Sequence, residues 1–260
     1  MFQQVVDLRE DGKVIHEYLL TLTDEQWPQV TPFKDLTCNE VVQHLHGSDK
    51  AAVYSLKDPD GFRENLAEAG TYTNPKGGTL KGQELVALWW EYFNEMCDLM
   101  GELEPSARVP WFGPDMGIRM FTTARQMETW AHAQDIYDLF DVVRENTDRI
   151  KNIVTIGVKT YGWTYVNRGM EVPADIPYIK LTSPSGEIWE YNDPNTNNYI
   201  EGSAVEFAHV ATQGRNIGDV HLKVVGDVAT EWMSFAQCFA GPAKDPPPVG
   251  KRNCKGYLEA

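Results

Sequence analysis

Residues 125–135 read Arg-Gln-Met-Glu-Thr-Trp-Ala-His-Ala-Gln-Asp, and this stretch predicts a metal-binding helix. Glu128 and His132 are four residues apart, and Asp135 follows three residues later. In a helix this spacing puts the three side chains on one face, about one turn apart. A carboxylate and an imidazole in this arrangement can hold one divalent metal ion, while Asp135 is close enough to orient a histidine ring. The alternative is an exposed Glu–His pair on an amphipathic helix.

A third ligand is expected from an earlier helix. The run Thr37-Cys38-Asn39-Glu40 has the pattern of a capping box, which marks a helix start. His44 then lies beside an apolar stripe, which consists of Val41, Val42, Leu45 and Ala52. His46 is about 200° further around the helix, so it cannot share the face of His44. We therefore predict that His44 is the ligand and that His46 is a solvated histidine.

Two motifs taken together resemble the DinB/YfiT-like metal-binding superfamily. They are His-Leu-x-x-x-Asp at residues 44–49 and Arg-x-x-Glu-x-Trp-x-His-x-x-Asp at residues 125–135. Within that superfamily the sequence is similar to the mycothiol-dependent maleylpyruvate isomerase branch, and most similar to an uncharacterised two-domain subgroup. Val-Pro-Trp-Phe-Gly-Pro at residues 109–114 and Ala-Gly-Pro at residues 240–242 also fit that subgroup. The resemblance covers nearly the whole chain.

The resemblance implies specific roles for several residues. His44, Glu128 and His132 match the family's metal ligands, which leave coordination positions open for water or substrate. The family's bound group is a low-molecular-weight thiol, whose thiolate adds to an electrophilic substrate. A second-domain arginine is thought to bind the anionic substrate or the thiol. Arg168 and Arg215, both in predicted turns, are the candidates for that role.

Charge and composition exclude several classes of function. The 260 residues include 23 basic and 38 acidic side chains, for a net charge of -15, so we expect no binding to nucleic acid or anionic membranes. No apolar run approaches the roughly 20 residues of a membrane span, and the first residues lack a secretion signal. The four cysteines show no pairing or metal-type spacing. We therefore expect reduced thiols and a cytoplasmic protein.

Helical periodicity predicts a four-helix bundle in the first half, with long helices near Val5, from Cys38, from Thr79 and after Gly117. Asp11-Gly12 weakens the first helix. The turn-rich segment from Asp58 to Gly78 is expected to contain a short helix around residues 63–69, and residues 104–117 are expected to be a loop. Placing His44 near Glu128 requires the second and fourth helices to be neighbours, which the resemblance implies and periodicity does not show.

The second half predicts a small α+β domain. The expected elements are a helix over 150–163, a hairpin of strands 176–182 and 187–191, a strand at 199–202, a helix over 203–213, a strand at 221–226 and a helix from Asp227 to about Phe239. The fold class is thus α+β, with a bundle at 1–147, a small α+β domain at 148–243 and a flexible tail at 244–260.

The remaining polar candidates are assigned structural roles. His16, His209 and His221 are expected to be surface or structural histidines, although His209 could reach a cleft. Asp49 is expected to cap or form a salt bridge near the ligands. Arg125 is expected to pair with Glu128 or with Asp49, since it lies one turn before Glu128.

The leading hypothesis is a divalent-metal-dependent thiol transferase or isomerase that activates a low-molecular-weight thiol, or water, and acts on a small electrophilic acid or acyl compound. Zinc is the expected ion and iron the alternative, with a low-molecular-weight thiol as a second cofactor. Two hypotheses stay open beside it: a non-haem iron(II) oxygen-dependent enzyme with the same ligands, and a non-catalytic metal-binding protein. The expected partner is a small-molecule substrate, and the expected assembly is a monomer or homodimer.

Overall fold

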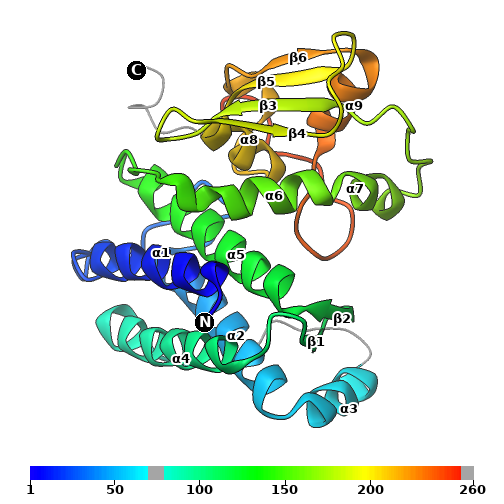
Figure 1. Ribbon diagram of the computed structural model, residues 1–260. Helices are drawn as coiled ribbons and strands as arrows, with labels where there is room; N and C mark the ends of the chain where they lie inside the picture. Colours follow the sequence, from blue (N-terminus) through cyan, green and yellow to red (C-terminus); the bar gives the residue numbers. More distant parts are fainter. Residues whose placement is uncertain (70–78, 253–260) are drawn as a thin grey trace. The chain divides into compact units, whose positions relative to one another are not determined.

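The computed structural model describes residues 1–69 and 79–252. The chain forms two compact units (Figure 1). Unit 1 is Met1–Ile136, and unit 2 begins at Tyr137. Unit 1 is helical, and unit 2 combines helices with a four-stranded mixed sheet. The predicted fold class, a helical N-terminal region followed by an α+β part, is confirmed.

The described part of unit 1 contains the four predicted long helices. Its elements are α1 (Gln3–Leu19), α2 (Cys38–Lys57), α3 (Pro59–Ala69), α4 (Gly82–Glu102), β1 (Arg108–Trp111), β2 (Gly113–Gly117) and α5 (Ile118–Leu139), the last of which runs on into unit 2. The apolar stripes of these helices form the core, with fully buried Leu8, Ile15, Leu45, Leu85, Trp89, Phe93, Phe121 and Trp130. Burial of large apolar side chains at helical spacing is what holds such a bundle together.

The start of α2 confirms the predicted capping box. Thr37 Oγ1 accepts a hydrogen bond from the Glu40 backbone N–H at 3.2 Å, and Glu40 Oε2 accepts one from the Thr37 backbone N–H at 2.8 Å. These bonds satisfy two donors that a helix otherwise leaves open at its first turn. The cap sets where α2 begins and therefore where His44 lies along it.

Two segments of unit 1 differ from the prediction. Residues 104–117, expected to be a loop, include the antiparallel hairpin β1–β2. The hairpin was not predicted because its register shifts between Val109 and Trp111, which breaks the alternation of side chains that reveals a strand. The helix expected around residues 63–69 begins earlier, at Pro59. Proline suits the first helical position because it has no N–H that would be left without an acceptor there, and Asp58 Oδ1 accepts a hydrogen bond from the Gly61 N–H at 3.0 Å. The predicted turn at residues 74–78 lies outside the described residues.

Helix α1 runs unbroken through Asp11-Gly12, where the sequence weakens the helical pattern. The reason is close packing: a Cβ atom at Gly12 would overlap the ring of Phe93, which is itself fully buried on α4. The glycine therefore lets α1 and α4 approach each other.

Gly12→Ala should lower the free energy of unfolding by up to about 2 kcal/mol, because overpacking a core costs about 1–3 kcal/mol and the gain in helix propensity offsets about 1 kcal/mol of that. Urea denaturation measures this difference. Gly162→Ala is the matched control, since the nearest atom to a Cβ there is 3.8 Å away and the substitution should be neutral or stabilising. Equal stabilisation by both substitutions would contradict the packing argument.

Unit 2 is built on one mixed sheet. Its described elements are a 3-10 turn at Asp148–Ile150, α6 (Lys151–Lys159), α7 (Tyr161–Asn167), β3 (Tyr178–Thr182), β4 (Ile188–Tyr191), β5 (Tyr199–Ser203), α8 (Ala204–Ala211), a 3-10 turn at Ile217–Asp219, β6 (Lys223–Val225) and α9 (Asp227–Phe235). The strand order is β4-β3-β5-β6, and β3 pairs antiparallel with β4 and parallel with β5. The predicted hairpin is confirmed.

Two details of unit 2 differ from the expected helices. The helix expected over 150–163 is divided into α6 and α7 at Thr160, whose Oγ1 bonds back to the carbonyls of Ile156 and Gly157. Asp227 is the first residue of α9 rather than its cap, because Gly226 holds a φ of 96° that ends β6. The helix stops at Phe235, earlier than expected.

Residues 244–252 of the predicted tail form hydrogen bonds with earlier residues of unit 2. The buried Arg252 donates from Nη1 to the Gln213 carbonyl at 3.0 Å, and Asn216 Nδ2 donates to the Pro247 carbonyl at 2.8 Å. Burial lowers the pKa of the Arg252 guanidinium to about 10. Residues 253–260 lie outside the described part of the chain.

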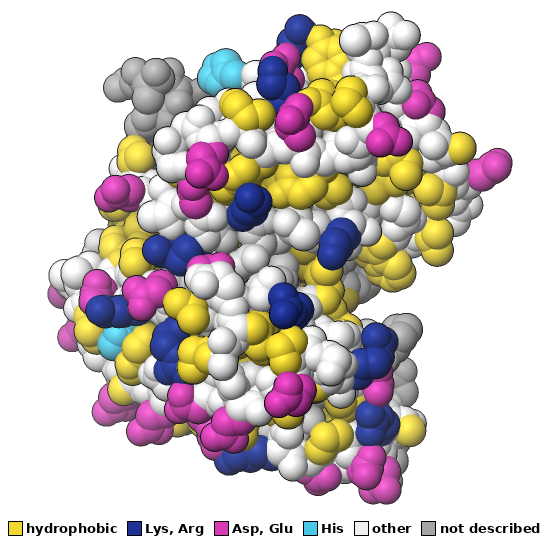
Figure 2. Space-filling model, viewed as in Figure 1, with side chains coloured by type: hydrophobic (Ala, Val, Ile, Leu, Met, Phe, Trp, Pro, Cys, Tyr) yellow, Lys and Arg dark blue, Asp and Glu magenta, His cyan; other side chains and the backbone are white. Residues whose placement is uncertain are grey.

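Many acidic side chains lie on the outer surfaces of the helices. Figure 2 shows them gathered along the edge of unit 1 that carries α4, where Glu84, Glu91, Asp98 and Glu102 are exposed opposite the buried stripe. Among the described residues, no helix combines the length and the apolar character that crossing a membrane requires.

Candidate metal centre

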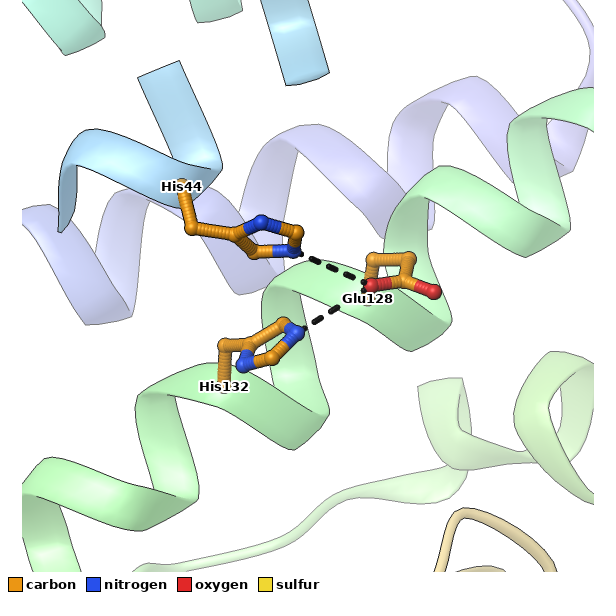
Figure 3. Close-up of side chains that lie close together, drawn as sticks. All are labelled: His44, Glu128 and His132. Carbon is orange, nitrogen blue, oxygen red and sulfur yellow. Dashed lines mark ion pairs between the residues drawn. The ribbon is translucent and has the colours of Figure 1, made fainter. Parts of the chain in front are cut away.

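The structure brings the three predicted ligands together within unit 1. His44 comes from α2, while Glu128 and His132 are one turn apart on α5, and all three point toward one another (Figure 3). His132 Nε2 lies 3.2 Å from Glu128 Oε2, and His44 Nε2 lies 3.6 Å from the same oxygen. Each residue offers one ligand atom, and these atoms lie within 4.8 Å of one another. The predicted adjacency of α2 and α5 at this point is therefore present.

These residues fit a metal ion in geometry and in chemistry. Ligand atoms about 2.1 Å from a tetrahedral ion lie about 3.4 Å from one another, and the two nitrogen-to-oxygen distances of 3.2 and 3.6 Å bracket that value. Two imidazoles and one carboxylate are a donor set suited to zinc or iron(II). The cluster can hold a metal ion, and its three protein ligands leave a position for a further group.

Burial and neighbouring charges favour the protonation states of His44 and Glu128 that metal binding requires. Burial lowers the pKa of the His44 imidazole, and the neighbouring His132 lowers it further against the opposing effect of Glu128. Burial alone would raise the pKa of Glu128, but its contacts with His132 and His44 outweigh that and hold it well below its usual value. Near neutral pH the site therefore offers a carboxylate and a neutral His44.

The side chains of the cluster are partly exposed. The side chains of His44 and Glu128 are 25% and 24% exposed, and that of His132 is 14% exposed. A closed structural site would be fully surrounded by protein, whereas partial exposure is typical of a site that exchanges a ligand.

Asp135 lies behind His132, on the side away from Glu128. Its Oδ2 is 3.4 Å from His132 Nδ1, and the side chain is almost fully buried. A carboxylate at this place can hold the ring with Nδ1 protonated and Nε2 turned toward the cluster. Asp135 is thus close to His132, and its predicted orienting role stays a prediction.

Phe33 is a neighbour of the site that sequence reasoning missed. Its ring meets the His132 ring edge-on, with the centroids 5.2 Å apart. The segment that carries it is closed by a hydrogen bond from the Thr31 N–H to the Leu36 carbonyl at 2.7 Å. Helical or strand periodicity does not apply to this loop, so the sequence carries no signal for the direction of the ring.

His46 lies outside the cluster but is not solvated, and the prediction of a solvated ring was wrong. The residue is 5% exposed, and its ring packs edge-on against Tyr92 with a centroid distance of 5.0 Å. The reason is that α2 packs on its neighbours along more than one face, so a residue turned away from His44 is still covered.

Arg125 pairs with Asp49, one of its two predicted partners. Its Nη2 and Nε donate to Asp49 Oδ1 at 2.8 and 3.2 Å, and both side chains are buried. The other oxygen of Asp49 accepts a hydrogen bond from Trp89 Nε1 at 2.9 Å. A buried tryptophan needs an acceptor for its indole N–H. Trp89, on the apolar face of its helix, was therefore the sequence signal for a buried polar network near the site.

The two arginine candidates each bind a carboxylate within unit 2. Arg215 donates from Nη1 and Nη2 to the two oxygens of Asp138, both at 2.6 Å, and the pair is buried. Arg168 donates to Asp245 at 2.9 Å, and its guanidinium lies over the ring of Phe235. Their predicted roles in binding an anionic ligand stay predictions.

The other histidines have packing or surface contacts. His16 stacks on Trp90 with the centroids 4.3 Å apart, and the exposed His221 has Nδ1 3.1 Å from Glu206 Oε1. His209 is buried in unit 2, where burial, followed by the cations of Arg215 and Arg144, lowers its pKa well below the usual value.

The free energy of unfolding should therefore fall as the pH drops below about 6.5, since His209 binds a proton in the unfolded chain and stays neutral in the folded protein. The expected slope from this group is up to about 1.4 kcal/mol per pH unit. Urea denaturation between pH 8 and pH 5 measures it, and His209→Gln should show a shallower slope than the wild type. An unchanged slope in that variant would exclude His209 as the cause.

Comparisons with known proteins agree with this description. Residues 9–137 match the model of the mycothiol maleylpyruvate isomerase N-terminal domain. Uncharacterized proteins from two strains of Mycobacterium tuberculosis are 29% identical to this chain over 247 residues, which is 92% of this chain and 95% of theirs.

A solved structure shares the fold over most of the chain. The crystal structure of the mycothiol-dependent maleylpyruvate isomerase matches with a TM-score of 0.53 and 15% identity, over 81% of this chain and 88% of that one. A point mutant of that enzyme matches equally well. At this identity the likeness shows the fold alone. By this match, residues 9–137 form a domain of the mycothiol maleylpyruvate isomerase N-terminal type.

Proposed function

We propose that the protein is a divalent-metal-dependent enzyme that activates a low-molecular-weight thiol for transfer to, or isomerisation of, a small electrophilic acid or acyl substrate. The observation that carries this proposal is the partly exposed cluster of His44, Glu128 and His132, whose ligand atoms lie within 4.8 Å of one another. Three protein ligands with a further position open are typical of catalytic rather than structural sites.

Zinc is the ion we propose, held by the two imidazoles and the carboxylate. Bound there, it would supply the charge that lowers the pKa of a thiol enough to give a thiolate near neutral pH. The choice of a thiol rests on the fold shared with a mycothiol-dependent isomerase, and the substrate class follows from the nucleophile, since a thiolate attacks electrophilic carbon.

The chain's own residues would orient and shield the site. Asp135, whose Oδ2 lies 3.4 Å from His132 Nδ1, would favour the proton on that nitrogen and so keep Nε2 available to the cluster. Phe33 covers one edge of the same ring and limits its rotation. With a neutral His44 and an ionised Glu128, the site can hold a cation without first losing a proton at either.

The test is thiol-dependent turnover by zinc-loaded protein. Cysteine, glutathione and mycothiol are each offered with maleylpyruvate and with an activated acyl ester, and loss of thiol or change of substrate is followed. We expect saturable turnover that needs both zinc and a thiol, and a loss of more than about 100-fold in Glu128→Gln. Glu84→Gln, a change on the exposed face of α4, is the control and should keep full activity. Turnover that survives in Glu128→Gln would contradict the proposal.

A further inference from the structure

The metal cluster is assembled from two separate helices, so its geometry depends on how α2 is placed against α5. His44 is the ligand from α2, and Glu128 and His132 are fixed to each other by their spacing on α5. Apolar packing tolerates small slides and rotations of one helix on another, whereas a metal site needs its ligands within about 0.5 Å of the productive geometry. Some directional contact must therefore set the two helices in register.

A buried ion pair joins the same two helices close to the ligands. Asp49 on α2 accepts two hydrogen bonds from Arg125 on α5, at 2.8 and 3.2 Å, and the side chains are 0% and 4% exposed. Asp49 lies five residues after His44, about 7.5 Å along α2, and Arg125 lies three residues before Glu128, about 4.5 Å along α5. The pair is thus about one turn from the cluster on both helices.

A third helix restrains the same carboxylate. Trp89 on α4 donates its indole N–H to Asp49 Oδ2 at 2.9 Å, and its ring is fully buried. With one oxygen bound to α5 and the other to α4, the Asp49 carboxylate cannot turn without breaking a buried bond. Breaking either bond leaves a buried polar group unpaired, which is the costly outcome in a protein interior.

We propose that Asp49 and Arg125 are positioning residues, which hold α2 against α5 so that His44 meets Glu128 and His132 around one metal ion. The inference rests on the proposed metal site. Neither residue touches the ion; each acts through the placement of a ligand-bearing helix. Like other contacts behind metal ligands, they should govern affinity for the metal as well as stability.

The test compares this ion pair with a second buried link to α5. Gln126, next to Arg125, donates to Asp11 on α1 at 2.8 Å, and both side chains are buried, but α1 carries no ligand. Leucine is placed singly at Asp49, Arg125, Asp11 and Gln126, and jointly at Asp49 and Arg125. Affinity for Co²⁺ is measured by competition with a chelator, the visible spectrum of the bound Co²⁺ is recorded, and urea denaturation gives the stability of the metal-free protein.

We expect all four single variants to be less stable, but only Asp49→Leu and Arg125→Leu to lose Co²⁺ affinity, by about 10- to 100-fold. Replacing both members of a buried pair with apolar residues often restores stability. The joint variant should therefore regain part of the lost stability, although the Trp89 N–H stays without its acceptor, while its Co²⁺ affinity stays low and its spectrum stays altered. Arg125→Lys, which keeps the charge but not the two-point contact, serves if a leucine variant does not fold, and it should also bind Co²⁺ more weakly.

Two results would overturn the inference while leaving the metal site intact. One is a loss of affinity in Gln126→Leu as large as that in Arg125→Leu. The other is recovery of wild-type affinity in the joint variant along with its stability, since either result makes the pair a stabilising contact only. Failure of the wild-type protein to bind Co²⁺ is a different outcome, which contradicts the proposed function and removes this inference with it.

Discussion

Arg215→Ala should lower the free energy of unfolding by about 3–5 kcal/mol, the usual cost of leaving one member of a buried ion pair without its partner. The Arg215 guanidinium makes two bonds of 2.6 Å to Asp138, and the carboxylate is fully buried. Removing the cation leaves that charge in a medium that solvates it poorly. Urea denaturation of the whole protein, followed by tryptophan fluorescence, measures the loss.

Arg168→Ala is the matched control for that substitution. Its partner Asp245 is 84% exposed, so water replaces the lost contact and the expected cost is only about 1 kcal/mol. Equal losses for the two arginines would contradict the burial argument. A large loss confined to Arg215 would show that its guanidinium is a structural partner of Asp138, whatever else it binds.

Zinc at about 1,000 times its dissociation constant should stabilise the folded protein by about 4 kcal/mol, because the ion binds the assembled ligands and not the unfolded chain. The melting temperature of metal-free protein, measured with and without zinc, reports this gain. His132→Ala should abolish the response, since it removes one of three ligands and the group that Asp135 contacts. Adding a chelator should reverse the gain in the wild type.

His46→Ala provides the control for a change near the site that spares the ligands. Its melting temperature should fall without any metal, because the ring of His46 fills a buried position against Tyr92. Its response to zinc should nevertheless equal that of the wild type. A zinc response lost equally in His46→Ala and His132→Ala would mean that general loosening of the helices, and not ligation, explains the result.

Local sequence patterns predicted where the three candidate ligands lie on their helices, because each position depends on helical spacing. Glu128 and His132 share a face through their spacing of four residues, and the cap at Thr37 sets the start of α2 and hence the place of His44. What spacing could not show is that α2 and α5 meet, because that contact joins residues far apart in the chain. The resemblance to a known family supplied it.

Other features depend on tertiary contacts that a single sequence does not display. The burial of His46 comes from Tyr92 on another helix, and Gly12 is explained only by the ring of Phe93. Strands β3 and β5 pair in parallel although β4 lies between them in the sequence, so this pairing has no local sequence signal. The choice of Asp49 over Glu128 as the partner of Arg125 was likewise decided by packing, since both lay within reach on sequence grounds.

The most direct test of the metal centre is elemental analysis of gently purified protein, with wild type, His132→Ala and His46→Ala treated alike. We predict about one zinc ion per chain in the wild type and in His46→Ala, and almost none in His132→Ala. Wild-type protein that is free of metal and stays so after zinc or iron is added would contradict it, as would His132→Ala holding as much metal as the wild type.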